Sequence, residues 1–301
     1  MYDTSDPRTA LANAITAPRA TEFAGADYVK FYQTPPAGHD PLARSWYARG
    51  QNFLVAYTQA EPGAVLARTA QPDEYAILLP DAGTEVSVQA GAQTETIKGY
   101  RIAFVPPGDS RVEVVKGGTV VRLFSARAED VAALCVNAAA YATPQPNTAL
   151  LEPWPEPVGG YRIRSYSLDV PPSPGRFGRI YRCTTLMVNV LDPWEGPRDT
   201  TKLSPHHHDD FQQGSLALSG EFVHHLRWPW TTDMNRWRND DHELCGSPSL
   251  AVIPPPSIHT TQAIGRGTNW LADLFSPPRI DFSEKTGWVL NADDYPMPKD
   301  A

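Results

Sequence analysis

The stretch Pro205-His206-His207-His208-Asp209-Asp210-Phe211-Gln212-Gln213-Gly214-Ser215-Leu216-Ala217-Leu218-Ser219-Gly220 carries the strongest signal in this sequence. His206 and His208 are two residues apart, so on an extended strand both imidazoles project from the same face and can bind one metal ion. His207 projects the other way and is not expected to be a ligand. Gln213 can add a neutral ligand. The stretch therefore predicts part of a metal site.

A third imidazole is expected from a distant part of the chain. His259 ends the segment Ile253-Pro254-Pro255-Pro256-Ser257-Ile258-His259, in which a Pro-rich turn leads back into apolar sequence. Three neutral imidazoles suit Zn, Cu, Fe or Ni, and three protein ligands that leave open positions indicate a catalytic ion. We expect one divalent ion to be bound by His206, His208, His259 and Gln213. A solvated loop is the alternative interpretation of the His run.

The spacing of these residues resembles the first motif of the cupin superfamily. That motif runs His-x-His, three or four residues, Glu, six residues, Gly. His206, His208 and Gly220 fit it, and Gln213 stands at the Glu position. The Gly that usually opens the motif is replaced by Thr200. The resemblance implies a double-stranded β-helix, or jelly-roll barrel, with a bound metal.

A second cupin motif, Pro-x-Gly-x-x-His-x-x-x-Asn, resembles the segment that holds His259. Pro254 and Pro256 stand at the Pro and Gly positions, and His259 stands at the His position. Ala263 replaces the Asn. The ligand positions match better than the turn positions, which supports the metal more than any one subfamily.

Composition and charge indicate an all-β protein that acts on small molecules. The chain has 301 residues, of which 30 are Pro and 21 are Gly, a composition that favours many short strands and turns. A net charge of −8 argues against a nucleic-acid partner and against an anionic membrane. We therefore expect a small-molecule substrate.

Cysteine usage and the N-terminal sequence indicate a cytoplasmic protein. Cys135, Cys183 and Cys245 are too widely spaced for a disulfide framework and are expected to be buried thiols. The N-terminal residues show no basic region followed by an apolar core, so we expect no secretory signal. No segment has the apolar length needed to cross a bilayer.

The chain is expected to form two cupin barrels joined by a short helix. Residues 1–24 form an N-terminal arm, with a short helix over 7–17, and residues 25–127 form a degenerate barrel. Residues 128–158 hold a helix over 129–141 and a Pro-rich linker, because Ala-rich sequence with acids at its start favours a helix. Residues 159–301 form the metal-binding barrel and a C-terminal tail.

The first barrel is expected to lack a metal. Glu74 stands at the Glu position of the first cupin motif, but Ala67 and Thr69 stand where the two His residues would be needed. Arg111 replaces the His of the second motif. Arg68, Glu74 and Arg111 are interpreted as a structural ion pair, or alternatively as an anion site.

Further candidates for function follow the ligand stretch. Glu221, His224 and His225 lie on the next expected strand, where the two His residues point oppositely, so at most one can face the cavity. They are the candidate catalytic residues. The insertion over 227–246 predicts a lid or a subunit contact, or else simple packing, and it holds Trp228, Trp230 and Trp237.

The resemblance leaves the reaction open, since cupins host many chemistries. Three-His cupins that resemble this site are often Fe(II) dioxygenases, so our first hypothesis is a dioxygenase acting on a small anionic or enolisable substrate. Fe is the preferred ion, with Mn, Ni, Zn and Cu as alternatives. The second hypothesis is a sugar or uronate isomerase or a lyase, because two-barrel ketouronate isomerases also resemble the chain, although they keep the Glu ligand. The third is a non-catalytic binding protein. The resemblance also implies a homodimer.

Overall fold

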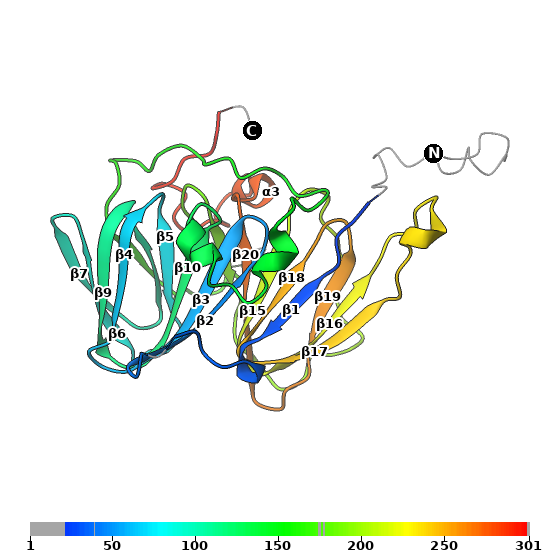
Figure 1. The fold of residues 1–301 in the computed structure, drawn as a ribbon, viewed down its shortest axis with the longest axis horizontal. Coiled ribbons are helices and arrows are strands. Elements are labelled where there is room, and N and C mark those ends of the chain that lie inside the picture. The colour runs from blue at the N-terminus through cyan, green and yellow to red at the C-terminus, as the bar shows by residue number, and fades with distance from the viewer. Residues whose placement is uncertain (1–21, 39, 174–175, 177, 300–301) are drawn as a thin grey trace.

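The structure is a computed structural model that describes residues 22–38, 40–173, 176 and 178–299 (Figure 1). Two curled bodies of strands lie side by side, as Figure 1 shows. The expected helix over 7–17 and most of the arm over 1–24 lie outside the described residues. No helix in the described ranges is long and apolar enough to cross a membrane.

Strands are the main regular elements of the described chain. The first half contains β1 (Asp27–Lys30), β2 (Ala43–Arg49), β3 (Phe53–Ala60), β4 (Val65–Gln71), β5 (Tyr75–Leu79), β6 (Glu85–Ala90), β7 (Gln93–Lys98), β8 (Arg101–Val105), β9 (Gly108–Lys116) and β10 (Gly118–Ser125). The second half contains β11 (Arg164–Ser167), β12 (Arg179–Arg182), β13 (Met187–Val190), β14 (Trp194–Glu195), β15 (Gln213–Ser219), β16 (Glu221–Arg227), β17 (Asp241–Gly246), β18 (Ser249–Ile253), β19 (Ile258–Ala263) and β20 (Thr268–Phe275). The helical segments are short: α2 (Glu129–Ala132), α3 (Ile280–Ser283), and the 3-10 turns η1 (Phe31–Gln33), η2 (Ala138–Tyr141) and η3 (Met234–Arg236).

Each barrel is made of a larger and a smaller antiparallel sheet. The first barrel combines the order β11-β8-β5-β10-β3-β2 with β4-β9-β6-β7. The second combines β1-β18-β15-β20-β13-β12, with β14 on β20, with β17-β16-β19. The larger sheets thus have the same order of corresponding strands, so the predicted all-β fold of two barrels is confirmed.

The first strand of each half of the chain pairs with the barrel that the other half forms. β1, from the segment 25–127, pairs antiparallel with β18 in the second barrel. β11, from the segment 159–301, pairs antiparallel with β8 in the first barrel. These strands cross the boundaries expected from the sequence, because a strand-like pattern predicts conformation and not the pairing partner. The boundaries themselves remain predictions.

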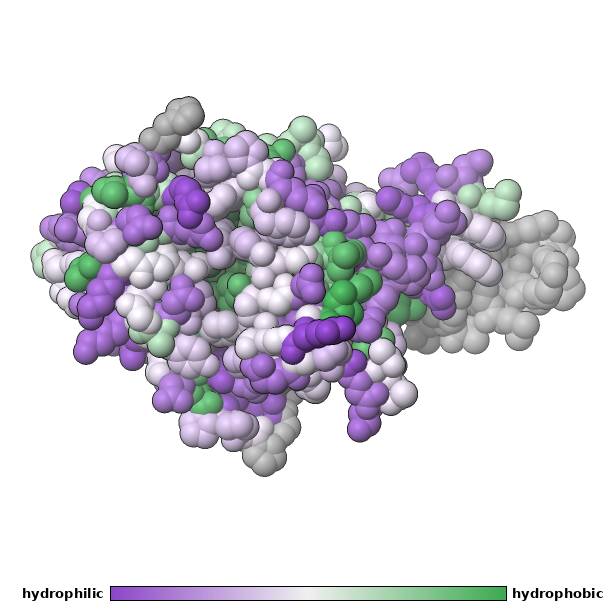
Figure 2. Space-filling view, turned by 90° about the horizontal axis from the view of Figure 1, so that it is seen from below, coloured by the Kyte–Doolittle hydropathy of each residue, from purple (hydrophilic) through white to green (hydrophobic). Residues whose placement is uncertain are grey.

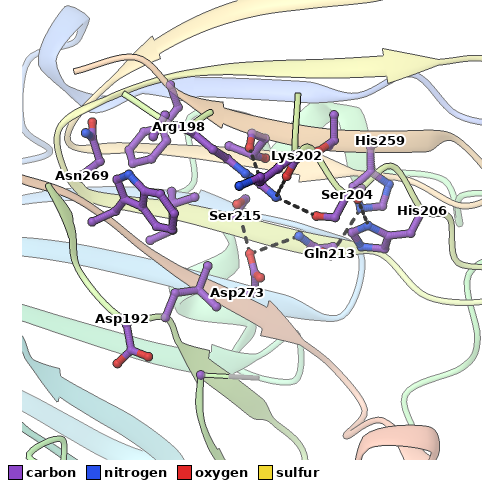
Figure 3. Close-up of a pocket in the computed structure, with 18 of the residues that line it drawn as sticks. Asp192, Arg198, Lys202, Ser204, His206, Gln213, Ser215, His259, Asn269 and Asp273 are labelled. Carbon is purple, nitrogen blue, oxygen red and sulfur yellow. Dashed lines mark hydrogen bonds between the residues drawn. The ribbon is translucent and has the colours of Figure 1, made fainter. Parts of the chain in front are cut away.

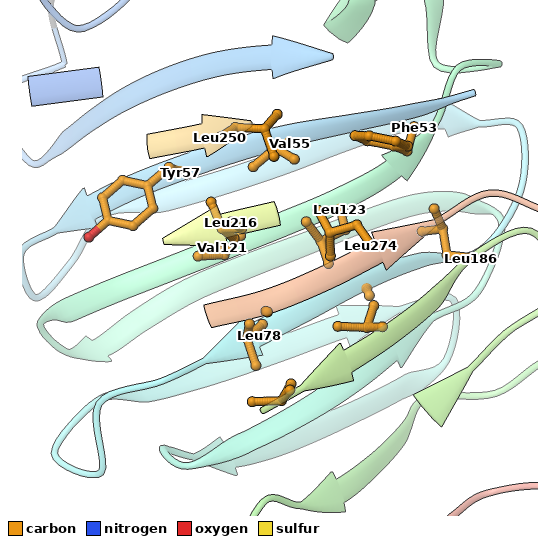
Figure 4. Close-up of a cluster of buried hydrophobic side chains, with 14 of the residues drawn as sticks. Phe53, Val55, Tyr57, Leu78, Val121, Leu123, Leu186, Leu216, Leu250 and Leu274 are labelled. Atoms are coloured by element: carbon orange, nitrogen blue, oxygen red, sulfur yellow. The ribbon is translucent and has the colours of Figure 1, made fainter. Parts of the chain in front are cut away.

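The main hydrophobic core lies between the two larger sheets (Figure 4). Side chains alternate along each strand, so Val121 and Leu123 of β10 point into this inter-barrel core while Val120 and Phe124 point into the first barrel. β5 is buried at every position, since both of its faces are covered. The sequence of β5 is therefore a continuous apolar run, Tyr75-Ala76-Ile77-Leu78-Leu79.

The expected helix over 129–141 is wrong in its length. Only Glu129–Ala132 is α-helical, and Ala138–Tyr141 forms a 3-10 turn. Cys135 packs in the interior of the first barrel, whereas Tyr141 packs in the inter-barrel core. Reaching two different cores requires the backbone to turn, and this packing overrides the helix propensity of the Ala-rich sequence.

The turn between β15 and β16 requires a glycine at position 220, where the first cupin motif also has one. Gly220 has a φ of +91°, and a Cβ at this position would lie 2.3 Å from Oδ1 of Asn269. Glycine meets both demands, because it has no Cβ and adopts positive φ without strain.

Polar side chains cover most of the surface seen in Figure 2, with small scattered apolar patches. The largest exposed apolar residues include Trp230 and Met234 of the insertion over 227–246. Trp230 stacks on Trp237 with a centroid separation of 4.8 Å, whereas Trp228 is buried and stacks on Phe23. The insertion itself contains β17, which pairs with β16.

Candidate metal centre

The structure brings the three histidines of the sequence prediction together. His206 and His259 form an isolated antiparallel bridge, in which each backbone N–H donates to the carbonyl of the other, at 3.0 and 2.7 Å. His208 lies in the loop that leads into β15, and its ring centroid lies 5.0 Å from that of His206 and 5.1 Å from that of His259. The donor atoms of the three side chains all lie within 4.8 Å of one another. No other such group of His, Cys, Asp and Glu occurs among the described residues.

Backbone carbonyls orient two of the imidazoles. Nδ1 of His206 lies 2.9 Å from the carbonyl oxygen of Ser204, and Nδ1 of His259 lies 3.1 Å from that of Ser257. Each Nδ1–H can donate to its carbonyl, which leaves the lone pair of Nε2 free for a ligand. The carbonyls thus select the tautomer that binds metal through Nε2.

Gln213 completes the group from the start of β15. Its Oε1 lies 3.1 Å from Nε2 of His208 and 3.4 Å from Nε2 of His259. Two ligand atoms bound at about 2.1 Å to a tetrahedral ion lie about 3.4 Å apart, so these separations suit a shared ion. The four residues fit a divalent transition metal by donor type and by spacing. Their role as ligands remains a prediction.

Burial keeps the imidazoles of His208 and His259 neutral. Desolvation, together with the charge of Arg279, lowers the pKa of His208 to about 2. Desolvation also lowers the pKa of His259 to about 4, with a contribution from His206. A neutral imidazole is the form that binds a metal, so both side chains are ready to ligate at neutral pH.

A carboxylate that the sequence reasoning missed lies behind Gln213. The Nε2 group of Gln213 donates to Oδ1 of Asp273 at 3.1 Å, and the Ser215 hydroxyl donates to the same oxygen at 3.1 Å (Figure 3). Burial raises the pKa of Asp273 to about 6. The signal in the sequence is an acid within the apolar strand Asn269-Trp270-Leu271-Ala272-Asp273-Leu274-Phe275.

A cavity of about 560 Å³ opens beside the four residues. Three cationic side chains line it, Arg176, Arg198 and Lys202, and apolar walls come from Leu191, Phe222 and Leu271. His206, Gln213, His259 and Asp273 also line it, so three of the four candidate ligands face open space. Arg198 donates to the Ser204 hydroxyl at 3.1 Å and thereby holds the segment that precedes His206.

None of the three candidate catalytic residues lines the cavity. His224 is fully buried on β16, where its Nδ1 lies 3.0 Å from the Thr261 hydroxyl, but it does not line the cavity. His225 points to the other face, and its Nδ1 lies 2.7 Å from Nδ1 of His242. Glu221 is exposed at the start of β16. A catalytic role for any of them remains a prediction that this arrangement does not favour.

The strand registers show which residues of the first barrel correspond to those of the candidate metal centre. Ile77 of β5 lies opposite Ala103 and Arg122, just as Ser215 of β15 lies opposite Ala251 and Asp273. Two residues earlier, Tyr75 corresponds to Gln213. The Tyr75 hydroxyl and the Ser110 hydroxyl lie 2.9 Å apart, so they hydrogen bond where Gln213 meets His259 in the second barrel.

Two expectations about the first barrel are therefore wrong. Glu74 does not take the position of Gln213, because its side chain points away from that barrel and accepts hydrogen bonds from Tyr295 and Thr184. Arg111 does not take the position of His259, because its side chain is exposed and pairs with Glu113. Arg68 pairs with Asp130 instead. The side chains alternate along a strand, so an error of one residue reverses the face.

Comparison with known proteins supports the fold. No protein-family model and no curated protein sequence matches the chain. Among solved structures, the oxalate decarboxylase of Lactobacillus farciminis in complex with formate matches with a TM-score of 0.57 and 11% identity, over 87% of this chain and 88% of that chain. AerE from Microcystis aeruginosa matches with a TM-score of 0.54 and 7% identity, over 80% and 95%.

A mutant of Bacillus subtilis oxalate decarboxylase matches with a TM-score of 0.55 and 12% identity, over 87% of this chain and 79% of that chain. Another structure of the Bacillus subtilis enzyme, with a TM-score of 0.55, concerns its Mn(II) centres. Identities this low establish the fold and leave the activity open. From its strand order, its repeated registers and these matches, the chain has the two-barrel cupin fold of the oxalate decarboxylases.

Proposed function

We propose that the protein is a metal-dependent enzyme whose second barrel binds one divalent transition metal through His206, His208 and His259, with Gln213 as a neutral ligand. The observation that carries the proposal is the convergence of the donor atoms within 4.8 Å at the wall of a cavity. Fe is our preferred ion. Mn gains support from the Mn(II) centres of a protein of the same fold.

The ligand set points to an anionic substrate. When bound, the ion would supply a Lewis acid that attracts and polarises a coordinating oxygen or sulfur atom. As neutral ligands, three imidazoles and the Gln213 amide would leave the ion its full positive charge. Arg176, Arg198 and Lys202 add positive charge to the same cavity. A small carboxylate, enolate, thiolate or catecholate fits this surrounding.

A dioxygenase is the first candidate reaction, because the resemblance to three-His cupins favours it and the apolar walls, formed by Leu191, Phe222 and Leu271, leave room for an organic substrate. A lyase that releases CO₂ is the second candidate. Asp273 favours it, since a buried carboxyl that lines the cavity and has a pKa near 6 can exchange a proton at neutral pH. Oxalate decarboxylases also share the fold.

The test combines metal analysis with two assays. Protein purified without oxygen is analysed for metal and then supplied with a diketone, a thiol, a catechol or oxalate, while O₂ uptake and CO₂ release are recorded together. We expect bound Fe and O₂ uptake that depends on one of the organic anions. CO₂ release without O₂ uptake would select the lyase, and a metal-free protein would reduce the proposal to a binding protein.

Two variants make the test specific to the candidate site. His259→Ala should lose both the metal and the activity, because it removes one of three imidazoles. His207→Ala is the matched control, since His207 is exposed and pairs with Asp209. Full metal content in His259→Ala would contradict the ligand assignment.

A further inference from the structure

The carboxylate behind Gln213 has a role that follows from its hydrogen bonds, if the proposed metal site is correct. We propose that Asp273 is a positioning residue. It holds the Gln213 amide with Oε1 toward the three imidazoles, and it places a negative charge one side chain away from the ion. The pair Gln213 and Asp273 thereby replaces the single Glu that the cupin motif has at this position.

The two ends of the Gln213 amide face different partners. Oε1 lies 3.1 Å from Nε2 of His208 and 3.4 Å from Nε2 of His259, while Nε2 of Gln213 donates to Oδ1 of Asp273 at 3.1 Å. A carboxylate only accepts hydrogen bonds, so it selects the NH₂ end of the amide. A flipped amide would place Oε1 against Oδ1 and would turn its NH₂ group toward the nitrogens that must bind the metal.

Asp273 is itself fixed, and it forms no ion pair within the described part of the chain. It lies opposite Ser215 in the register of β15 and β20, and the Ser215 hydroxyl donates to it at 3.1 Å. Only 6% of its surface is exposed. Within the described part of the chain, no Lys, Arg or His nitrogen lies within 4.0 Å of its carboxylate oxygens. The charge of Arg279 acts on Asp273 only from outside ion-pair distance, so a cation held by the nearby imidazoles would further compensate this buried anion.

The first barrel carries the opposite charge at the same place. Arg122 lies opposite Ile77, as Asp273 lies opposite Ser215, and Arg122 is also buried. That barrel has Tyr75 and Ser110 in place of Gln213 and His259. The barrel with the three histidines thus has a buried anion behind the candidate ligands, and the barrel without them has a buried cation.

The test exchanges amide and carboxylate between the two positions. Co²⁺ affinity is measured by titration, with the visible absorption of Co²⁺ as the signal, for the wild type, Asp273→Asn, Gln213→Glu and the double variant. In the wild-type background Asp273→Asn should weaken Co²⁺ binding about 10-fold, in the range found for residues that support metal ligands. In the Gln213→Glu background the same change should strengthen binding about 10-fold, because it removes repulsion between two adjacent carboxylates.

This reversal of sign separates positioning from a packing role. A shift in the same direction in both backgrounds, or no shift in either, would overturn the inference. The double variant keeps the formal charge and nearly the volume of the wild-type pair, so it guards against loss of folding in a single variant. Ser215→Ala is the matched control, since it removes a hydrogen bond from Asp273 and leaves Gln213 in place, and its affinity should change less than that of Asp273→Asn.

The affinities do not depend on turnover. A wild type that binds no Co²⁺ would overturn both the metal site and this inference. A wild type that binds Co²⁺ and shows the reversal, yet turns over none of the tested anions, would count against the proposed reactions alone.

Discussion

At the residue scale, His224 differs from His206 and His259 because it does not line the cavity. It is fully buried, its Nδ1 meets the Thr261 hydroxyl, and its Nε2 has no hydrogen-bond partner among the described residues. Desolvation lowers the pKa of His224 to about 3. Its neutral ring therefore belongs to the packing of β16, and its protonation would oppose folding.

The dependence of stability on pH should reveal that His224 is neutral in the folded protein. Below pH 6.5 the unfolded chain protonates His224 while the folded chain does not, so the free energy of unfolding falls as the pH falls. Between pH 6.5 and 5 the loss from His224 amounts to about 2 kcal/mol. Urea unfolding of the metal-free wild type and of His224→Leu at pH 7.5 and 5 checks this. The variant should lose less stability on acidification, and an equal loss in both proteins would contradict the prediction.

At the element scale, the turn between β18 and β19 decides which side chain points inward. His259 follows the end of β18 at Ile253 by six residues, whereas Ser110 follows Val105, the end of β8, by five. The additional residue brings an imidazole to the inward face of the second barrel. In the first barrel the inward position goes to Ser110, and Arg111 faces solvent.

Deleting Ile258 should therefore remove the metal site and keep the barrel. The deletion moves His259 by one position along β19, and this turns its imidazole to the outer face. We expect Co²⁺ affinity to fall at least 100-fold, while a cooperative thermal transition persists in the metal-free protein. Ile258→Ala is the control, because Ile258 is exposed and its truncation leaves the register unchanged. Unchanged Co²⁺ affinity in the deletion variant would contradict the assignment of His259.

The same turns explain what the sequence could and could not predict. The two-residue spacing of His206 and His208 is a local property, and with a distant third His it was enough to find residues that the structure brings together. A register shift of one residue decides whether Glu74 and Arg111 face into or out of the first barrel. No local sequence pattern predicts a register that accurately. Asp273 was missed because its partner Gln213 lies 60 positions away in the chain.

At the scale of the whole molecule, the barrels depend on each other through the exchanged strands and a shared core. β1 completes the larger sheet of the second barrel, and Val29 of β1 packs in the inter-barrel core. Leu216 and Leu274 of the second barrel face Val121 and Leu123 of the first across that core (Figure 4). The pairing of β1 and β11 was beyond sequence reasoning, because both strands join partners far away in the chain.

The segment 159–301 should not fold alone as a metal-binding barrel. It lacks β1, it would carry β11 without its partner β8, and it would expose the apolar face that packs in the inter-barrel core. We expect neither a cooperative thermal transition nor Co²⁺ binding from this fragment, under conditions in which the full chain shows both. A folded fragment that binds Co²⁺ with the affinity of the full chain would contradict this dependence.

The exchange of β1 and β11 also limits how the two halves can be recombined. In a chimera that joins this second barrel to a first barrel from another protein, β18 has no partner strand on one side. The other protein would have to provide a strand equivalent to residues 27–30. The segments needed for grafting are thus discontinuous in the sequence, because residues 27–30 lie far from residues 159–301 along the chain. Protein engineers would have to transplant both pieces together.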